Sequence, residues 1–205
     1  GLEETDFESV HRPIDQLVHA AGAEIYHTGA EARSLLTIRS GLVKLTQYLP
    51  DGTQRIVRLQ GATDILGLEA LLASTYQHTA TALQPTEVCR IPVETVRQLS
   101  ERRPQLYHEL MARWFRALSD ADRSITELST GNARARVARL LLMLAERSGG
   151  NRCQLFSRED LGAVLGLTTE TASRAMAELK RQGFMTEPRA NEFILDIDEL
   201  RALAM

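Results

Sequence analysis

The sequence predicts an α+β protein in which two domains are joined by one long helix. Short apolar runs separated by glycines occupy the first half, a seven-residue apolar repeat follows, and helical patterns with a short β tail complete the chain. Its 205 residues exceed the usual size of one domain, and 43% hydrophobic with 25% charged residues is typical of a folded globular protein. We expect the boundaries 1–102, 103–130 and 131–205.

The first domain is predicted to consist of closely spaced antiparallel strands between Glu24 and about Val96. The apolar runs are 25–27, 35–39, 42–48, 55–59, 78–83 and 88–91. Glycines separate these runs, and the pair Asp51-Gly52 is typical of a tight turn between strands. An antiparallel sandwich or barrel is expected, and a β-roll satisfies the pattern.

The segment from Arg103 to Ser129 has the period of a coiled coil. Two interleaved series recur every seven residues, and together they predict a dimer seam of Tyr107, Met111, Trp114, Leu118, Ala121, Ile125 and Leu128. A second apolar row, Leu106 and Leu110, is placed to pack on the β domain. A single helix packed only on its own domain is the alternative to self-association.

Three helices and a pair of strands are predicted after Asn132. Ala133 to Arg147 has one apolar face and is followed by Gly149-Gly150. The second helix is expected to begin at the N-cap Ser157, with acidic residues in its first turn, and to stop at Gly166. The third is capped by Thr168 or Thr169 and runs to about residue 182, and residues 184–197 suggest two short strands.

The second and third of these helices have the spacing of a helix-turn-helix. Gly162, Gly166 and Ala172 are small residues at positions where two helices cross closely, and such a motif places the start of its second helix in the major groove. That start presents Thr168, Thr169, Glu170, Ser173 and Arg174. Arginine can bond guanine, glutamate can accept from cytosine N4, and serine can do either, so the predicted base-reading residues are Thr169, Glu170, Ser173 and Arg174.

Basic side chains around the motif are candidates for phosphate contacts. Arg136, Arg158, Lys180 and Arg181 are expected near the backbone of a duplex, with Thr168 at the helix start. A solvated surface position explains Lys180 and Arg181 equally well. The net charge of −3 hides a regional excess, because residues 131–190 contain ten basic and six acidic residues whereas residues 1–130 contain thirteen and seventeen.

Other function classes lack support in the sequence. No paired carboxylates, Ser-His-Asp set, metal-ligand cluster or phosphate-cradling loop is present, so we expect no enzyme and no metal site. Cys89 and Cys153 are far apart, which fits a reducing compartment, and Cys89 is interpreted as a small buried hydrophobe. No apolar run reaches the length of a membrane span, and residues 1–10 are acidic, so a cytoplasmic location without membrane contact is expected.

Several motifs together resemble one known family. They are 156–162 (Phe-Ser-Arg-Glu-Asp-Leu-Gly), 170–174 (Glu-Thr-Ala-Ser-Arg), 38–41 (Ile-Arg-Ser-Gly), Asp51-Gly52 and 88–92 (Val-Cys-Arg-Ile-Pro). Across nearly the whole chain the sequence is similar to the CRP/FNR superfamily, which contains the catabolite activator protein and the fumarate and nitrate reductase regulator.

The resemblance implies a cyclic-nucleotide-binding-like β-roll, a dimerisation helix and a winged helix-turn-helix. It further implies a homodimeric transcription regulator that works with RNA polymerase on double-stranded DNA. Glu170, Ser173 and Arg174 match the family's Glu-x-x-Ser-Arg reading motif, which implies a pseudo-palindrome similar to TTGAT-N4-ATCAA. The family's phosphate-contacting pair falls on Ser157 and Arg158.

The departures from the family concern the signal. Cyclic-AMP-binding members hold the phosphate with Glu and an Arg-Ser pair, but the matching positions here are Leu68, His78 and Thr79, so cyclic AMP is not expected. Only Cys89 matches the cysteines of the oxygen-sensing branch, and one thiolate cannot hold an iron-sulfur cluster. Because the sequence starts at Gly1, cysteines upstream are left open.

The cofactor therefore stays unknown. The branch that lacks those cysteines responds to nitrogen oxides, often through haem, and the five histidines at 11, 19, 27, 78 and 108 are candidate axial ligands without ligand spacing. A signalling adaptor that binds protein through its C-terminal helices is the alternative function. Target genes, the direction of regulation and the signal are not determined by the sequence.

Overall fold

The computed structural model describes residues 15–204 and divides the chain into two compact units. One unit contains residues 1–47 and 57–120, and the other contains residues 48–56 and 121–205. Predictions made for residues 1–10 and for His11 lie outside the described residues. The domain boundaries expected from the sequence stay a prediction, because the long helix belongs to both units.

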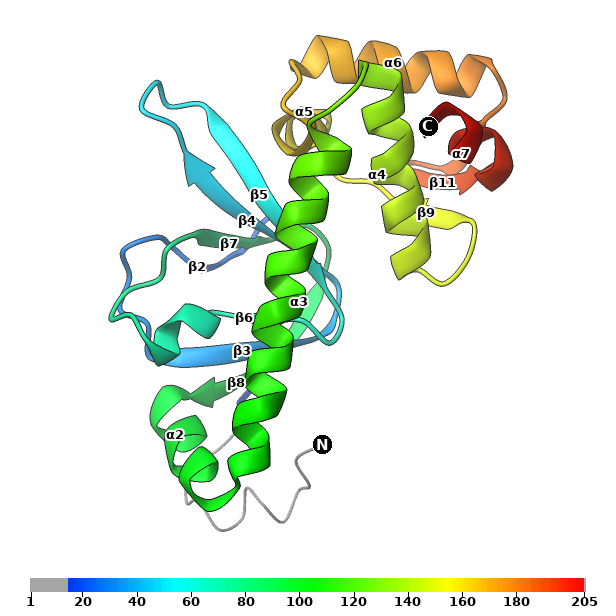
Figure 1. The fold of residues 1–205 in the computed structure, drawn as a ribbon. Coiled ribbons are helices and arrows are strands. Elements are labelled where there is room, and N and C mark those ends of the chain that lie inside the picture. Colours follow the sequence, from blue (N-terminus) through cyan, green and yellow to red (C-terminus); the bar gives the residue numbers. More distant parts are fainter. Residues whose placement is uncertain (1–14, 205) are drawn as a thin grey trace. The chain divides into compact units, whose positions relative to one another are not determined.

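The first unit is built on two four-stranded sheets (Figure 1). One sheet has the order β1 (Asp15–His19), β8 (Thr86–Pro92), β3 (Ser34–Ser40) and β6 (Ile65–Leu66). The other has the order β2 (Glu24–Tyr26), β7 (Thr79–Ala82), β4 (Leu42–Tyr48) and β5 (Gln54–Gly61). All six predicted runs contain strands, and the β-roll class is confirmed. β1 and β6 were missed.

The core of this unit lies between the sheets and continues onto two helices. Leu36 and Ile38 of β3 are buried with Val43 and Leu45 of β4. A short 3-10 helix, η1 (Leu68–Leu71), adds the buried Leu68 to the same core. Burial of such side chains contributes about 1.5 to 3 kcal/mol each, so this cluster accounts for much of the stability of the roll.

The prediction of strand character as far as Val96 was wrong, because a helix already begins at Val93. α2 (Val93–Arg102) follows directly on Pro92, with Glu94 in its first turn. Its apolar residues Val93, Val96 and Leu99 are three residues apart and are all buried, which is the spacing of one helix face. The helix therefore packs on the roll instead of extending it.

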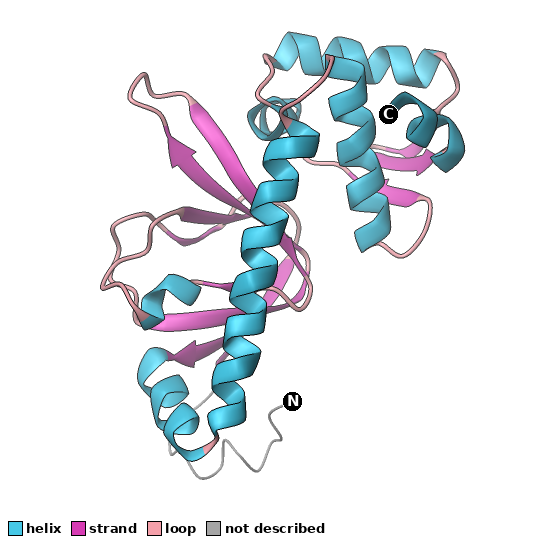
Figure 2. Cartoon of the chain, viewed as in Figure 1, coloured by secondary structure: helices cyan, strands magenta, loops and turns pink. Residues whose placement is uncertain are grey.

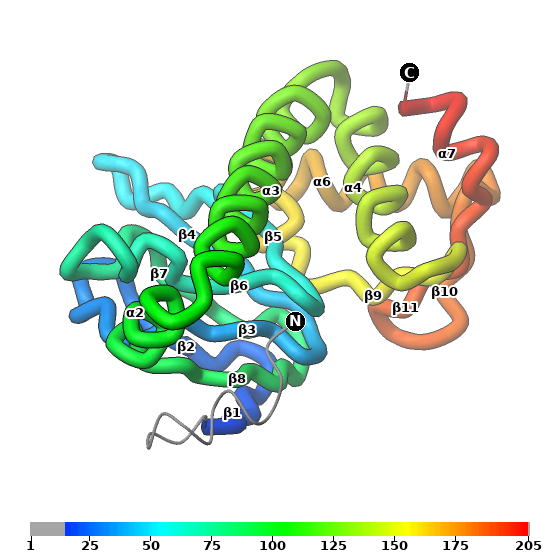
Figure 3. Tube along the Cα trace, turned by 60° about the horizontal axis from the view of Figure 1, so that its bottom comes forward, coloured from blue at the N-terminus to red at the C-terminus, as the bar shows by residue number. Residues whose placement is uncertain are grey.

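The long helix α3 (Pro104–Leu128) uses two sides for two purposes. Leu106 and Leu110 are buried in the core cluster of the first unit, as predicted, and Trp114 packs partly against it. Figure 3 shows the first part of α3 running across the strands of its own unit. A different side carries five exposed apolar residues, which we call the apolar stripe: Tyr107, Met111, Phe115, Leu118 and Ile125.

The predicted seam and the apolar stripe overlap only in part. Trp114 is half-buried against its own chain, and Leu128 is 3% exposed. Phe115, which was not in the predicted seam, is 69% exposed. The seam itself stays a prediction.

The second unit contains helices on a three-stranded sheet (Figure 2). The helices are α4 (Ala133–Arg147), α5 (Arg158–Leu165), α6 (Thr169–Arg181) and α7 (Ile197–Ala204). The sheet has the order β10 (Met185–Arg189), β11 (Glu192–Leu195) and β9 (Arg152–Gln154). The three predicted helices and the strand pair are confirmed, whereas β9 and α7 were not predicted.

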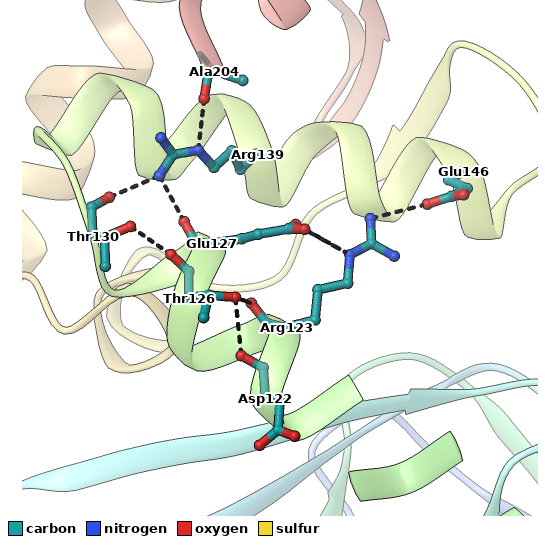
Figure 4. A network of polar contacts seen from close by, with 8 residues as sticks. All are labelled: Asp122, Arg123, Thr126, Glu127, Thr130, Arg139, Glu146 and Ala204. Carbon is teal, nitrogen blue, oxygen red and sulfur yellow. Dashed lines mark hydrogen bonds and ion pairs between the residues drawn. The ribbon is translucent and has the colours of Figure 1, made fainter. Parts of the chain in front are cut away.

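Arg139 of α4 fastens two helix ends to each other within this unit (Figure 4). Its Nε donates to the carbonyl of Ala204 at 2.8 Å, and its Nη1 donates to the carbonyls of Glu127 and Thr130 at 2.9 and 2.8 Å. The last carbonyls of a helix lack helical partners and carry partial negative charge, so a guanidinium is the matching donor. The ends of α3 and α7 are thereby held at α4.

Candidate functional site

The turn between α5 and α6 has the geometry of a helix-turn-helix. Ser157 caps α5, since its Oγ accepts a hydrogen bond from the backbone N–H of Asp160 at 3.0 Å. Gly166 ends the helix with a φ of 62°, a left-handed conformation that favours glycine. The predicted start and stop of this helix are both confirmed.

Close packing at the turn depends on two small side chains. A Cβ atom added to Gly162 would lie 2.7 Å from the carbonyl oxygen of Leu167, so the backbone of the turn occupies the space that a side chain would need. Ala172 of α6 is the second small residue of the motif, and it is fully buried. The chain can therefore bring α6 tightly against α5 only with residues of this size.

α6 is amphipathic, and its outer side is the candidate reading surface. Thr168 is the N-cap, because its Oγ1 accepts from the N–H of Thr171 at 3.2 Å. One side of the helix is buried and consists of Ala172, Ala175, Met176 and Leu179. The four predicted base-reading residues lie away from that side, with Thr169, Glu170 and Arg174 exposed and Ser173 half-buried.

The charges at the start of α6 suit recognition of bases. The backbone N–H of Glu170, the Thr168 hydroxyl and the Arg174 guanidinium all lower the pKa of the Glu170 carboxyl, which therefore stays an acceptor. Arg174 makes one long contact, from Nη2 to Thr171 Oγ1 at 3.4 Å. A side chain held this weakly can turn toward a base edge at little cost.

The predicted phosphate contacts are engaged with other groups of the chain. Arg136 donates to the carbonyls of Gly131 and Leu165 at 2.9 and 3.2 Å, and the Arg158 guanidinium lies 6.0 Å from the centre of the Phe193 ring. The Ser157 hydroxyl donates to the Asp160 carboxylate. A phosphate would therefore have to share Arg136 and Ser157 with their present partners, whereas the Nη1 atom of Arg158 has no hydrogen-bond partner in the structure.

Lys180 is joined to the hairpin of β10 and β11 through Glu187. The Glu187 carboxylate lies 2.9 Å from Lys180 Nζ and accepts from the N–H of Asn191 at 3.0 Å. Lys180 is the main cause that lowers the pKa of Glu187, followed by the Asn191 N–H, with Arg158 adding to it. Glu187 therefore binds the end of α6 to the turn of the hairpin.

The hairpin turn contains a candidate that the sequence reasoning missed. Asn191 has a φ of 61°, typical of a tight turn, and Arg189 next to that turn is 85% exposed in its side chain. An asparagine between two short apolar runs was the available signal for this turn. Arg189 belongs with the basic residues that could approach a duplex.

In the first unit, the positions that bind a cyclic phosphate in the resembling family are filled differently. Leu68 and Thr79 are buried, and a Cβ atom added to the preceding Gly67 would lie 2.8 Å from the Tyr76 ring. That ring stacks on Tyr26 with centroids 3.9 Å apart. Aromatic side chains therefore occupy space next to the loop at Gly67.

The described histidines lie apart from one another. His27 lies 3.3 Å from Glu24 at the surface, His108 is exposed, and no two histidines are brought together by an observed contact. Among residues 15–204, no group of three or more His, Cys, Asp or Glu side chains could hold a metal ion. Burial raises the pKa of the Cys153 thiol to about 12, which leaves that cysteine unreactive.

His78 is expected to make the first unit sensitive to acid. Burial is the main cause that lowers its pKa below the ordinary 6.5, and the nearby charge of Arg58 lowers it further. Since the unfolded chain then takes up a proton at a higher pH than the folded chain, stability is complete above about pH 6.5 and falls as the pH drops toward the folded pKa.

A His78→Gln variant should therefore lose less stability than the parent between pH 7.5 and pH 5.5. Calorimetric unfolding at several pH values measures this, with His27→Gln as the control because His27 is exposed. An equal acid response in parent and His78→Gln chains would contradict the assignment.

The comparisons with known proteins divide the chain as its geometry does. Residues 16–103 match the family described as cyclic nucleotide-binding domain, and residues 135–203 match the Crp-like helix-turn-helix domain. Within residues 15–204, no helix has the length and apolar character needed to cross a membrane.

Relatives that regulate transcription match nearly the whole length of this chain. The transcriptional activator protein anr of Pseudomonas aeruginosa is 33% identical over 189 residues, covering 89% of this chain and 78% of that protein. The fumarate and nitrate reduction regulatory protein of Vibrio cholerae is 30% identical over 208 residues, covering 96% and 83%.

Solved structures agree with this. FixK2 of Bradyrhizobium japonicum has a TM-score of 0.85 at 26% identity, covering 95% of this chain and 98% of that one. A CRP-family regulator of Thermus thermophilus has a TM-score of 0.79 at 27% identity, covering 92% and 96%. The chain thus belongs with regulators and not with enzymes: it is a member of the CRP/FNR family of transcription regulators and carries a helix-turn-helix DNA-binding domain.

Proposed function

We propose that the protein acts as a homodimer that reads a pseudo-palindromic site similar to TTGAT-N4-ATCAA with helix α6 of each copy. The observation that carries this proposal is the outer side of α6, where Glu170, Ser173 and Arg174 lie together, opposite the buried side of the helix. In this reading Arg174 bonds guanine O6 and N7, Glu170 accepts from cytosine N4, and Ser173 and Thr169 complete the contact with the bases.

Two copies are joined along the apolar stripe of α3. Apolar side chains at 107, 111, 115, 118 and 125 lie in water in a single chain, which costs free energy that a second copy would recover. A two-fold dimer can place its reading helices roughly 34 Å apart, one turn of the duplex, so each copy meets one half-site.

Phosphate contacts would hold the dimer in register. Thr168, at the start of α6, and Ser157 and Arg158, at the start of α5, lie where backbone N–H groups also favour anions. Arg136, Lys180 and Arg189 supply further positive charge. Since Lys180 already has a carboxylate partner, its contact with phosphate requires that the ion pair with Glu187 opens or is shared.

The β-roll would sense the signal and change the population of dimers that are able to bind DNA. A redox signal or a nitrogen oxide is the candidate class, and cyclic AMP is not proposed, since neither Leu68 nor His78 supplies the charges that a cyclic phosphate needs. Regulation of transcription then involves contact with RNA polymerase at the promoter.

Arg174→Ala is the direct test of the reading surface. Specific affinity for a duplex carrying the proposed site should fall by roughly 1 to 3 kcal/mol, or about 10- to 100-fold, because a bidentate contact with guanine is lost. Affinity for a scrambled duplex should fall much less. Titration by fluorescence anisotropy at two salt concentrations measures both.

Arg181→Ala is the matched control, because it removes the same charge from the last turn of α6. It should change specific and scrambled affinities about equally. Unchanged specific affinity in Arg174→Ala would show that another residue reads the site, and an absence of salt-dependent affinity in the parent protein would favour a protein-binding adaptor instead.

A further inference from the structure

A cavity of about 160 Å³ lies in the first unit where α2 and α3 cover one sheet. Leu35, Ile65 and Ile91 line it from β3, β6 and β8, and Leu99, Leu106 and Leu110 line it from the two helices. Leu35 shares its face of β3 with Thr37, which also lines the cavity, whereas the neighbouring Leu36 belongs to the opposite face. The cavity is thus separate from the interior between the two sheets.

We propose that this cavity binds a small, neutral, apolar effector about the size of one aromatic ring. An engineered cavity of about 150 Å³ lined by aliphatic and aromatic side chains stays dry and binds benzene, so a space of this size in which seven of the ten lining residues are aliphatic suits such a molecule. No histidine or cysteine lines the cavity, so it offers no axial ligand for haem. A cavity of this size is too small for a nucleotide, and most of its lining is apolar.

The polar groups at the cavity are two opposite charges on one helix. Glu109 and Arg113 are four residues apart on α3 and both line the cavity. Arg113 also donates a hydrogen bond to the carbonyl of Thr63 in the loop before β6. Because the two charges are opposite and lie close together on one helix, they favour neither an anionic nor a cationic ligand.

Four of the lining residues belong to α3, which links the cavity to the apolar stripe. Leu106 and Leu110 are buried on the inner side of the helix, and Tyr107 and Met111 of the stripe are their immediate neighbours in the sequence. A ligand that pushes on Leu106 and Leu110 would therefore move the side chains that are proposed to meet the second copy. This regulatory step rests on the proposed function, whereas binding of the ligand does not.

Benzene is the probe for binding, and Trp114 is the reporter. Trp114 is the only tryptophan of the chain, follows Arg113, and packs partly against the core of the first unit. Benzene at millimolar concentration should shift its emission in a saturable way and raise the temperature at which the first unit unfolds. No saturable change in emission or in unfolding temperature would overturn the proposed site.

Two variants locate the binding. Val96→Phe fills the cavity from α2 and should abolish the response, whereas Val57→Phe adds the same volume at a partly buried position that does not line it and should retain the response. If Val96→Phe fails to fold, Leu99→Ala enlarges the cavity and should bind ethylbenzene at least as tightly as benzene. A response to benzene unaffected by either cavity variant would also overturn the site.

The regulatory step is tested on the full chain with DNA. Saturating benzene should change the affinity for the specific duplex by at least fivefold in the parent and in Val57→Phe, and by less than twofold in Val96→Phe. Saturable binding without any change in DNA affinity would overturn the effector role and leave the proposed function intact. A parent protein that binds no duplex in the absence of benzene or in its presence would overturn the proposed function, and the emission titration would still test the site.

Discussion

Leu118→Asp and Ile125→Asp together are expected to convert the protein into a monomer and to lower its affinity for a duplex with two half-sites by more than about 100-fold. Both side chains are more than half exposed and lie on the apolar stripe. Burying two carboxylates at an interface without partners costs several kcal/mol, which exceeds what the remaining apolar contacts recover. Two linked reading helices gain roughly 10² to 10⁴ in avidity, and a monomer loses that gain.

Sedimentation equilibrium measures the mass, and anisotropy measures the affinity for duplexes with one and with two half-sites. Gln105→Asp with Ala112→Asp is the matched control, because these exposed positions are also seven residues apart on α3 but lie on another side of the helix. The control should stay dimeric. A stable dimer in the Leu118→Asp, Ile125→Asp chain would reject the apolar stripe as the interface.

Local signals of the sequence were strong enough to predict the helix-turn-helix and the ends of its helices. Ser157, Gly166 and Thr168 act through hydrogen bonds and backbone angles within a few residues of themselves, so their roles can be inferred without knowing the rest of the fold. α4 was predicted with its observed ends for the same reason, since Asn132 caps one end and glycines follow the other.

Partners distant in the sequence could not be predicted. Arg136 bonds Leu165 across 29 residues, and Arg139 bonds Ala204 across 65, yet both appear in the sequence as ordinary helix cations. The short strands β6 and β9 lack a period of their own, because they are fixed by the strands beside them. The side of α3 that faces its own unit is likewise decided by contacts with residues far away in the sequence, as at Trp114, which packs partly against the core of the first unit.

The residues of the candidate reading surface could be proposed from the sequence, but the contacts that hold neighbouring side chains in place could not. Glu170, Ser173 and Arg174 could be placed on one side of a helix by spacing alone. The ion pair between Lys180 and Glu187, by contrast, forms only because the chain reverses direction within the seven residues that separate them. The sequence therefore indicates which groups could contact DNA, but only the structure shows which of these groups already have a partner within the chain.

Gly162→Val is expected to destabilise the DNA-binding domain by about 3 kcal/mol, which lowers the unfolding temperature of a domain of this size by roughly 12 to 24 °C. The added Cβ would lie 2.7 Å from the Leu167 carbonyl, a backbone atom that cannot rotate away, so α5 and the turn would have to separate. Because α6 follows that turn, the reading surface should lose its position and specific affinity should fall with stability.

Gly162→Ala separates this clash from helix preference. Alanine is favoured over glycine inside a helix by about 1 kcal/mol, so preference alone predicts a more stable protein, whereas the clash predicts a less stable one. Gly150→Ala and Gly150→Val are the matched controls, since nothing lies within 4 Å of a Cβ added there. In calorimetry, the unfolding temperature of Gly162→Ala should be lower than that of the parent, and that of Gly162→Val should be the lowest of the three. If both Gly162 variants unfold at the temperatures of their Gly150 counterparts, the close approach of α5 to the turn is not what holds the motif together.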